Sequence, residues 1–253
     1  MMEKNEKQIE QLRSMIKESR QGVVFTGAGI STESGIPDFR SPGGIWTKYQ
    51  PINFNDFMAS EKMRRESWRR KFASDAVMKK AKPNKGHLAV GKLVQQGKVS
   101  SVITQNIDGL HQMSGVPDEK VIELHGNATY ASCLDCGKRY ELEEVHKIFE
   151  KDETLPICDQ CSGIIKTATI SFGQAMPIAE MQAAERETLA CDLFIAIGSS
   201  LVVYPAAGFP ELAKRNNARL VIINRDPTPL DGIADLVLNT EIGPTLSAAV
   251  DFD

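Results

Sequence analysis

The sequence predicts an α/β protein with a parallel sheet covered by helices on both faces. Short apolar segments typical of buried strands alternate along the chain with longer stretches of helical periodicity. Consecutive parallel strands require a crossover connection, which such helices provide. Glycine and polar residues directly follow several strands, as in sheets that bind a ligand at their carboxyl edge. The 253 residues suffice for one large domain with a smaller insertion.

The N-terminal helices and strands are predicted from the spacing of apolar residues and from the proline and glycine residues that mark loops. Apolar residues at helical spacing predict an amphipathic helix over residues 3–20. The apolar run 23–25 is typical of a buried strand, and proline and glycine then mark a loop. A polar helix with scattered aromatic residues is expected over 54–80. Its basic run, 64–71, is interpreted as a solvated helix face.

The remaining elements are predicted in the same way. Asn84 is a suitable N-cap for the next helix, because its side chain can accept from the first free backbone N–H groups. The other expected helices are 178–189 and 206–217, and the expected strands are 99–104, 121–124, 169–172, 193–197, 220–224 and 236–239.

The turn after the first strand consists of small residues only, from Thr26 to Gly29. A short helix is expected next, so that free N–H groups and a positive dipole end face a phosphate. The dinucleotide fingerprint is incomplete, because Thr32 stands where a third glycine is expected and no acidic residue follows at the ribose position. The pattern fits a bound dinucleotide and equally a plain tight turn, and it gives poor support to hydride transfer.

Polar or glycine-rich segments follow five of the predicted strands, and the carboxyl ends of parallel strands meet at one edge. A single crevice is therefore expected, surrounded by Gly27-Ala28-Gly29, Gln105-Asn106-Ile107-Asp108, His125-Gly126, Gly198-Ser199-Ser200 and Asn224-Arg225. An imidazole with a pKa near 6.5 suits a general base, so His125, beside the flexible Gly126, is a catalytic candidate; a non-catalytic role is the alternative. The amides and carboxylate of 105–108 suit a carboxamide and a ribose, although an Asx-type turn explains them equally well.

Four of the five cysteines form two Cys-x-x-Cys hooks, Cys133 with Cys136 and Cys158 with Cys161. Two such hooks supply four thiolates for a tetrahedral zinc site that has no open position and is therefore structural. Disulfides are the alternative, and an intracellular setting disfavours them. Cys191 opens an apolar strand and is interpreted as an inert core residue.

Composition narrows the class of protein. Hydrophobic residues make up 42% and charged residues 25%, and the net charge of -3 with a pI of about 5.9 does not favour a nucleic-acid or anionic-membrane binder. The N-terminal residues lack the apolar core of a signal peptide, and the longest apolar stretch, 193–209, is interrupted by serines and a proline. A cytoplasmic protein is expected.

Taken together, these motifs resemble those of the sirtuin family, the NAD-dependent protein lysine deacylases. The matching segments are Gly27–Ser31, Ser34–Arg40, Thr104–Asp108, His125-Gly126, the two cysteine hooks, Phe172-Gly173, Gly198–Leu201 and Asn224, in the order of the family. The resemblance implies a Rossmann-like domain formed by 1–40, 87–130 and 169–253. It also implies a smaller module, formed by a helical insertion, 41–86, and a zinc-ribbon-like insertion, 131–168.

The resemblance further implies NAD as a consumed co-substrate, structural Zn²⁺ on the four cysteines, and a set of site residues. The implied contacts with the phosphates and the adjoining ribose are Ala28, Thr32, Arg40 and Gln105. The implied contacts with nicotinamide are Phe39, Ile107 and Asp108, and those with the adenosine half are Ser199, Ser200, Asn224 and Ile242. The implied catalytic residues are Asn106, which orients the ribose, Asp108, and the general base His125.

The implied reaction frees lysine and yields nicotinamide and O-acyl-ADP-ribose. The acyl-lysine peptide is expected as an added strand between 170–173 and 200–203. Neutral acyl groups are expected, because 68–72 lacks the Tyr-x-x-Arg pair of the desuccinylating branch. Gln174 replaces a common glutamate, a departure that bears on how the peptide is gripped. A mono-ADP-ribosyltransferase and a non-catalytic NAD sensor are the alternatives. A monomer without nucleic-acid or membrane partners is favoured.

Overall fold

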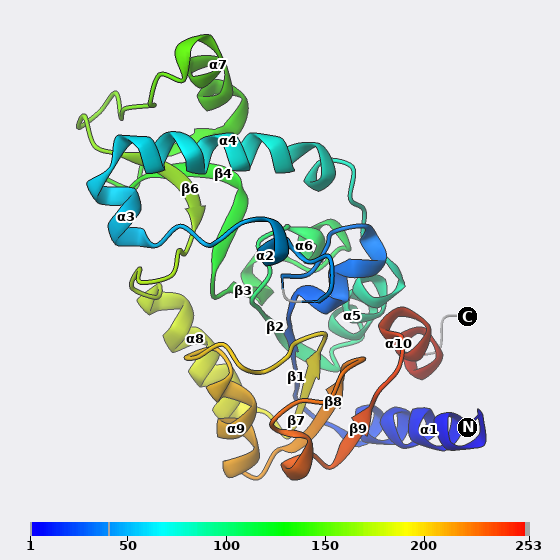
Figure 1. The fold of residues 1–253 in the computed structure, drawn as a ribbon. Coiled ribbons are helices and arrows are strands. Elements are labelled where there is room, and N and C mark those ends of the chain that lie inside the picture. Colours follow the sequence, from blue (N-terminus) through cyan, green and yellow to red (C-terminus); the bar gives the residue numbers. More distant parts are fainter. Residues whose placement is uncertain (1, 40, 251–253) are drawn as a thin grey trace.

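The computed structural model describes residues 2–39 and 41–250, and its largest element is a six-stranded sheet in the order β3-β2-β1-β7-β8-β9 (Figure 1). Every neighbouring pair in this sheet is parallel. Its strands are β1 (Gly22–Thr26), β2 (Val99–Thr104), β3 (Val121–Glu123), β7 (Leu193–Ile197), β8 (Arg219–Ile223) and β9 (Leu236–Leu238). The predicted parallel sheet is confirmed.

Helices cover both faces of this sheet, because successive residues of its strands point to opposite sides. Val24 of β1 joins a core with α1 (Met2–Glu18), α5 (Lys85–Gln95) and α10 (Ile242–Val250). Its neighbours Val23 and Phe25 join the opposite core, with α8 (Ile178–Ala190) and α9 (Gly208–Arg215). The fold is therefore the doubly covered α/β architecture that the sequence predicts.

A smaller antiparallel sheet adjoins the main one, in the order β5-β4-β6. It consists of β4 (Gly126–Cys133), β5 (Arg139–Glu141) and β6 (Ile165–Thr169), and α7 (Leu142–Asp152) follows β5 directly. Trp68 of the long helix α4 (Glu61–Met78) packs in one core with Phe149 of α7 and Ile165 of β6. The helical segment and the cysteine segment thus share a hydrophobic core.

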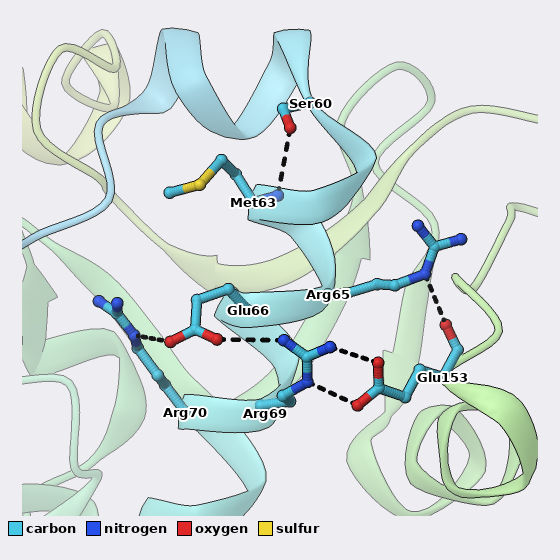
Figure 2. Close-up of polar contacts among 7 residues, drawn as sticks. All are labelled: Ser60, Met63, Arg65, Glu66, Arg69, Arg70 and Glu153. Atoms are coloured by element: carbon cyan, nitrogen blue, oxygen red, sulfur yellow. Dashed lines mark hydrogen bonds and ion pairs between the residues drawn. The ribbon is translucent and has the colours of Figure 1, made fainter.

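Ion pairs join α4 (Glu61–Met78) to the end of α7 (Figure 2). Arg69 donates to both carboxylate oxygens of Glu153, at 2.5 Å each, and to Glu66 at 3.2 Å. Arg70 donates to the other oxygen of Glu66 at 2.7 Å, and Arg65 donates to the Glu153 carbonyl at 3.2 Å. The expectation of a merely solvated basic face is therefore wrong, because these arginines tie two chain segments together.

Two predicted elements require correction. The expected helix 54–80 is broken: α3 (Phe54–Ala59) ends before Ser60, whose hydroxyl accepts from the Met63 N–H and caps α4 (Figure 2). The expected strand 169–172 is wrong, because β6 lies earlier and pairs in the small sheet. The strand was not predicted because its only apolar residues are Ile165 and Ala168, and the other three are two threonines and a lysine.

The other predicted elements are confirmed within a few residues. Asn84 caps α5 as expected, since its side chain accepts from Gly86 N–H at 2.8 Å. The remaining described elements are short: α2 (Ile45–Lys48), α6 (Leu110–Met113), and 3-10 helices at Ala28–Ser34, Asp118–Lys120 and Asp231–Ile233. Among the described helices, none has the length and apolar character needed to cross a bilayer.

Candidate active site

The carboxyl edge of the main sheet opens into a cavity of about 710 Å³. Strand exits and loops that are far apart in the sequence meet there, as the crevice prediction requires. The predicted site residues on its wall are Ala28, Thr32, Phe39, Gln105, Asn106, Ile107, His125, Ser199, Ser200, Asn224 and Ile242. Arg40 lies outside the described residues.

The small-residue turn packs against the exit of β7. Gly27 and Gly29 donate their N–H groups to the carbonyls of Ile197, at 3.0 Å, and Gly198, at 2.8 Å. A Cβ on Gly29 would lie only 2.7 Å from the Gly198 Cα. The expectation of free N–H groups is wrong at these two positions. The glycines instead allow two strand exits to approach each other, which brings Ala28 and Ser199 to one wall.

A buried hydrogen-bonded chain lies behind this wall. Asn106 is 8% exposed, and its Nδ2 donates to the Gly27 carbonyl and to the Ser31 Oγ, both at 3.1 Å. The Ser31 hydroxyl donates in turn to Asp108 Oδ2 at 2.7 Å, while Oδ1 accepts from Leu110 N–H at 3.0 Å. Asp108 is therefore absent from the cavity wall among the described residues and contacts it through Ser31 and Asn106.

Two histidines sit deeper in the same region. His87 Nδ1 accepts from the Asn84 N–H at 3.3 Å and so completes a capping box at the start of α5. His111 is buried, and its Nε2 lies 2.9 Å from the Thr26 hydroxyl. Burial lowers the pKa of His87 to about 4 and that of His111 to about 3, so both rings are neutral at pH 7. Neither ring lines the cavity.

His125, in contrast, faces the cavity. Its Nδ1 lies 3.0 Å from the Gln105 carbonyl, which only accepts hydrogen bonds, so Nδ1 carries the proton in the neutral ring. Nε2 then holds the lone pair. Burial lowers the pKa of His125 below its usual 6.5, against an opposing effect of the Gln105 bond. The ring is a neutral base at pH 7 with its accepting nitrogen fixed.

Gly126 fixes the backbone beside this histidine. Its φ of 72° lies in the left-handed region, and a Cβ would be 2.1 Å from the Ala168 carbonyl oxygen. The Ile170 N–H donates to the His125 carbonyl at 2.8 Å. The interpretation of Gly126 as flexible is wrong, because close backbone packing holds it in place.

An aromatic bridge on the cavity wall was not predicted from the sequence. Trp46 stands between Phe39 and Phe172, with ring centroids 5.5 and 5.6 Å apart. Trp46 lies in the short helix α2 and the two phenylalanines lie in separate loops, so no sequence periodicity predicts their contact. Glu33, Asp226, Thr240 and Glu241 also line the cavity without having been predicted. The cavity wall therefore combines apolar rings with carboxylates.

The four clustered cysteines form a candidate metal centre. Their sulfur atoms all lie within 4.8 Å of one another, with Cys133 and Cys161 at 3.5 Å and Cys136 and Cys158 at 3.6 Å. A Zn–S distance of about 2.3 Å gives a tetrahedron with edges of about 3.8 Å, close to these separations. All four are free thiols, so the disulfide alternative is not supported. Cys191 is buried, as expected of a core residue.

Comparisons with known proteins agree with this geometry. A model described as the Sir2 family matches residues 27–205. An NAD-dependent protein deacetylase of Bradyrhizobium diazoefficiens is 60% identical over 242 residues, covering 96% of this chain and 95% of its own. One from Thermotoga maritima is 44% identical over 231 residues, covering 90% and 91%.

Solved structures extend the likeness to the fold. A Sir2 structure with a p53 peptide and NAD+ has a TM-score of 0.83 at 39% identity, over 94% of this chain and 95% of that one. A Sir2 mutant with a deacetylated p53 peptide and 3'-O-acetyl ADP-ribose has a TM-score of 0.87 at 38% identity, over 96% and 100%. The family model covers well over half of the sequence, and the protein belongs to the Sir2 family.

Proposed function

We propose that this protein uses NAD to remove acetyl and other neutral acyl groups from lysine side chains of proteins. The observation that carries the proposal is His125, held at the cavity wall with Nε2 free to accept a proton, in a chain of the Sir2 family. NAD is consumed, and the products are nicotinamide, O-acyl-ADP-ribose and free lysine.

The cavity wall supports a definite placement of NAD. The apolar side chains of Phe39 and Ile107 suit the planar nicotinamide ring, and the buried Asn106 amide suits the hydroxyls of the adjoining ribose. We assign Ala28, Thr32, Arg40 and Gln105 to the phosphate and ribose region, and Ser199, Ser200, Asn224 and Ile242 to the adenosine half. Each oxygen of the Asp108 carboxylate already accepts one hydrogen bond and can accept another, so the carboxamide can donate to it beside the Ser31 hydroxyl.

The chemistry divides into two stages. In the first, the acyl-lysine amide oxygen attacks C1′ of the ribose while the bond from C1′ to nicotinamide breaks. In the second, His125 Nε2 takes a proton from the ribose diol, and the 2′ oxygen attacks the imidate carbon that the first stage formed. Water then completes the transfer, and lysine leaves as the free amine. His125 is therefore needed after nicotinamide has departed.

The substrate polypeptide fits a cleft between two chain segments. Ile170–Gly173 lines the cavity on one side, and Ser200 and Val203 line it on the other. Residues beyond β6 have left the small sheet. The Ile170 N–H and the Phe172 carbonyl are already paired, with His125 and Phe54, so an added strand pairs with the other backbone groups of this segment or displaces these bonds. We place the acyl-lysine peptide there in extended form, with its side chain directed toward the nicotinamide ribose.

The same proposal divides the chain into two domains. Residues 1–40, 87–130 and 169–253 form the Rossmann-like NAD-binding domain, and residues 41–86 and 131–168 form the smaller one. Zn²⁺ held by the four cysteine thiolates supplies no open coordination position, so it acts on structure and takes no part in the reaction.

One assay tests the function directly. Acetyl-, butyryl-, succinyl- and myristoyl-lysine peptides are incubated with the protein and NAD, and nicotinamide and peptide mass are followed together. We expect one nicotinamide per acyl group removed, with the succinyl peptide unchanged. Peptide or protein that gains the mass of ADP-ribose while acyl-lysine persists would instead identify a mono-ADP-ribosyltransferase.

A further inference from the structure

A second apolar groove lies on the surface between α8 and α9, the two helices that cover one face of the main sheet (Figure 1). Its volume is about 370 Å³. Met176, Ile178 and Met181 form one wall, and Pro205, Phe209 and Leu212 form the other. None of the sequence motifs lies in this groove, and the reaction proposed at His125 does not use it.

The groove is continuous with the proposed substrate cleft. Met176 and Pro205 line both the groove and the large cavity. Because β7 and β8 are parallel, α8 and α9 both begin at the carboxyl edge of the sheet, where that cavity lies. A polypeptide that leaves the cleft past Pro205 therefore meets the open end of the groove.

The groove exposes apolar side chains that the fold does not need at the surface. Ile178 is 75% exposed, the largest value among the large hydrophobic residues that the structure describes, and Tyr204 beside Pro205 is 64% exposed. The core contacts of α8 are made by residues such as Ala184, on the face turned toward the sheet. An exposed apolar strip with a polar border, here Gln182 and Glu185, is typical of a recognition surface.

We infer that this groove binds an apolar side chain of the same polypeptide that carries the acyl-lysine, outside the segment paired in the cleft. The inference rests on the proposed function and adds a second contact for the substrate. The two methionines give the groove an adaptable surface, so leucine, methionine and phenylalanine side chains all fit it. Substrate choice is then set by an apolar residue at a fixed spacing from the modified lysine.

The test uses acetyl-lysine peptides and NAD with the full chain. A short peptide has glycine and serine flanks only, and a longer series carries one leucine at successive positions on either side. We expect kcat/KM to rise about tenfold at one or two adjacent spacings, the effect of burying one aliphatic side chain. Ile178→Ser should remove most of this gain and leave the short peptide unaffected.

Leu189→Ser provides the matched control, because Leu189 is 44% exposed at the opposite end of the same helix. It should keep the full gain. Equal kcat/KM at every spacing, or a gain that survives Ile178→Ser, would overturn the inference. The inference would also be overturned if Ile178→Ser changed only the self-association of the protein, measured by sedimentation. The groove would then bind a second copy of the chain. A short peptide that is not deacetylated at all would refute the proposed function instead.

Discussion

His125 and Gly126 show how two adjacent residues position the nitrogen atom that we propose as the general base. The Gln105 carbonyl fixes the proton on Nδ1 of His125, and close packing of Gly126 on Ala168 fixes the backbone that carries the ring. The sequence placed both residues at a strand exit. It did not reveal the Ala168 contact, because that contact joins β4 to β6, two paired strands of the small sheet that lie far apart in the sequence.

Gly126→Ala should destabilise the protein and abolish acyl removal. The left-handed backbone costs an alanine about 1 to 2 kcal/mol, and the collision of Cβ with the Ala168 oxygen adds to that cost. Chemical denaturation measures the loss. Gly97→Ala is the control, because Gly97 has a φ of 70° with nothing within 4 Å of the added Cβ. Equal losses in the two variants would show that the contact with Ala168 does not matter.

The pH dependence of acyl removal should report the lowered pKa of His125. A base works in its neutral form, and burial extends that form to a pH below the usual 6.5. We expect kcat/KM for the acetyl peptide to stay level from neutral pH downward and to decline only below about pH 6.5. Nicotinamide exchange needs no base and should lack this limb. An acidic limb centred above 6.5 would contradict the assignment.

At the scale of elements, periodic segments were predictable and contacts between them were not. Strand 193–197 agrees with β7 residue for residue, because five consecutive buried apolar residues leave little ambiguity. β6 was missed, since four of its five residues are Lys166, Thr167, Ala168 and Thr169. The arginines of α4 were predicted to lie on a solvated face, because the ion pair with Glu153 could not be foreseen from the sequence. Glu153 lies 84 residues away from Arg69.

The cysteine hooks predict one zinc ion per chain. Cys136→Ala should abolish the bound zinc and unfold the small antiparallel sheet, because two thiolates from each hook join β4 to the segment before β6. Elemental analysis measures the metal, and circular dichroism the structure. Cys191→Ala is the matched control, as Cys191 is buried away from the cluster. Full zinc content in the Cys136 variant would show that the four sulfurs are not its ligands.

At the scale of the whole molecule, two sheets and several loops create a cavity that no single segment contains. The order of motifs was enough to predict which strand exits meet. The aromatic bridge of Phe39, Trp46 and Phe172 and the groove between α8 and α9 were not predictable, because both arise only when distant segments pack. The shared wall at Met176 and Pro205 makes cavity and groove one extended surface for a polypeptide.

The central claim is that NAD is cleaved by acyl-lysine and that His125 acts after this cleavage. The most direct measurement compares the intact protein with His125→Ala, following labelled nicotinamide exchange and free lysine in the same reaction. We predict that the variant forms no free lysine yet still exchanges nicotinamide, and only when the acetyl peptide is present. Free lysine formed at the rate of the intact protein, or exchange without peptide, would contradict the account.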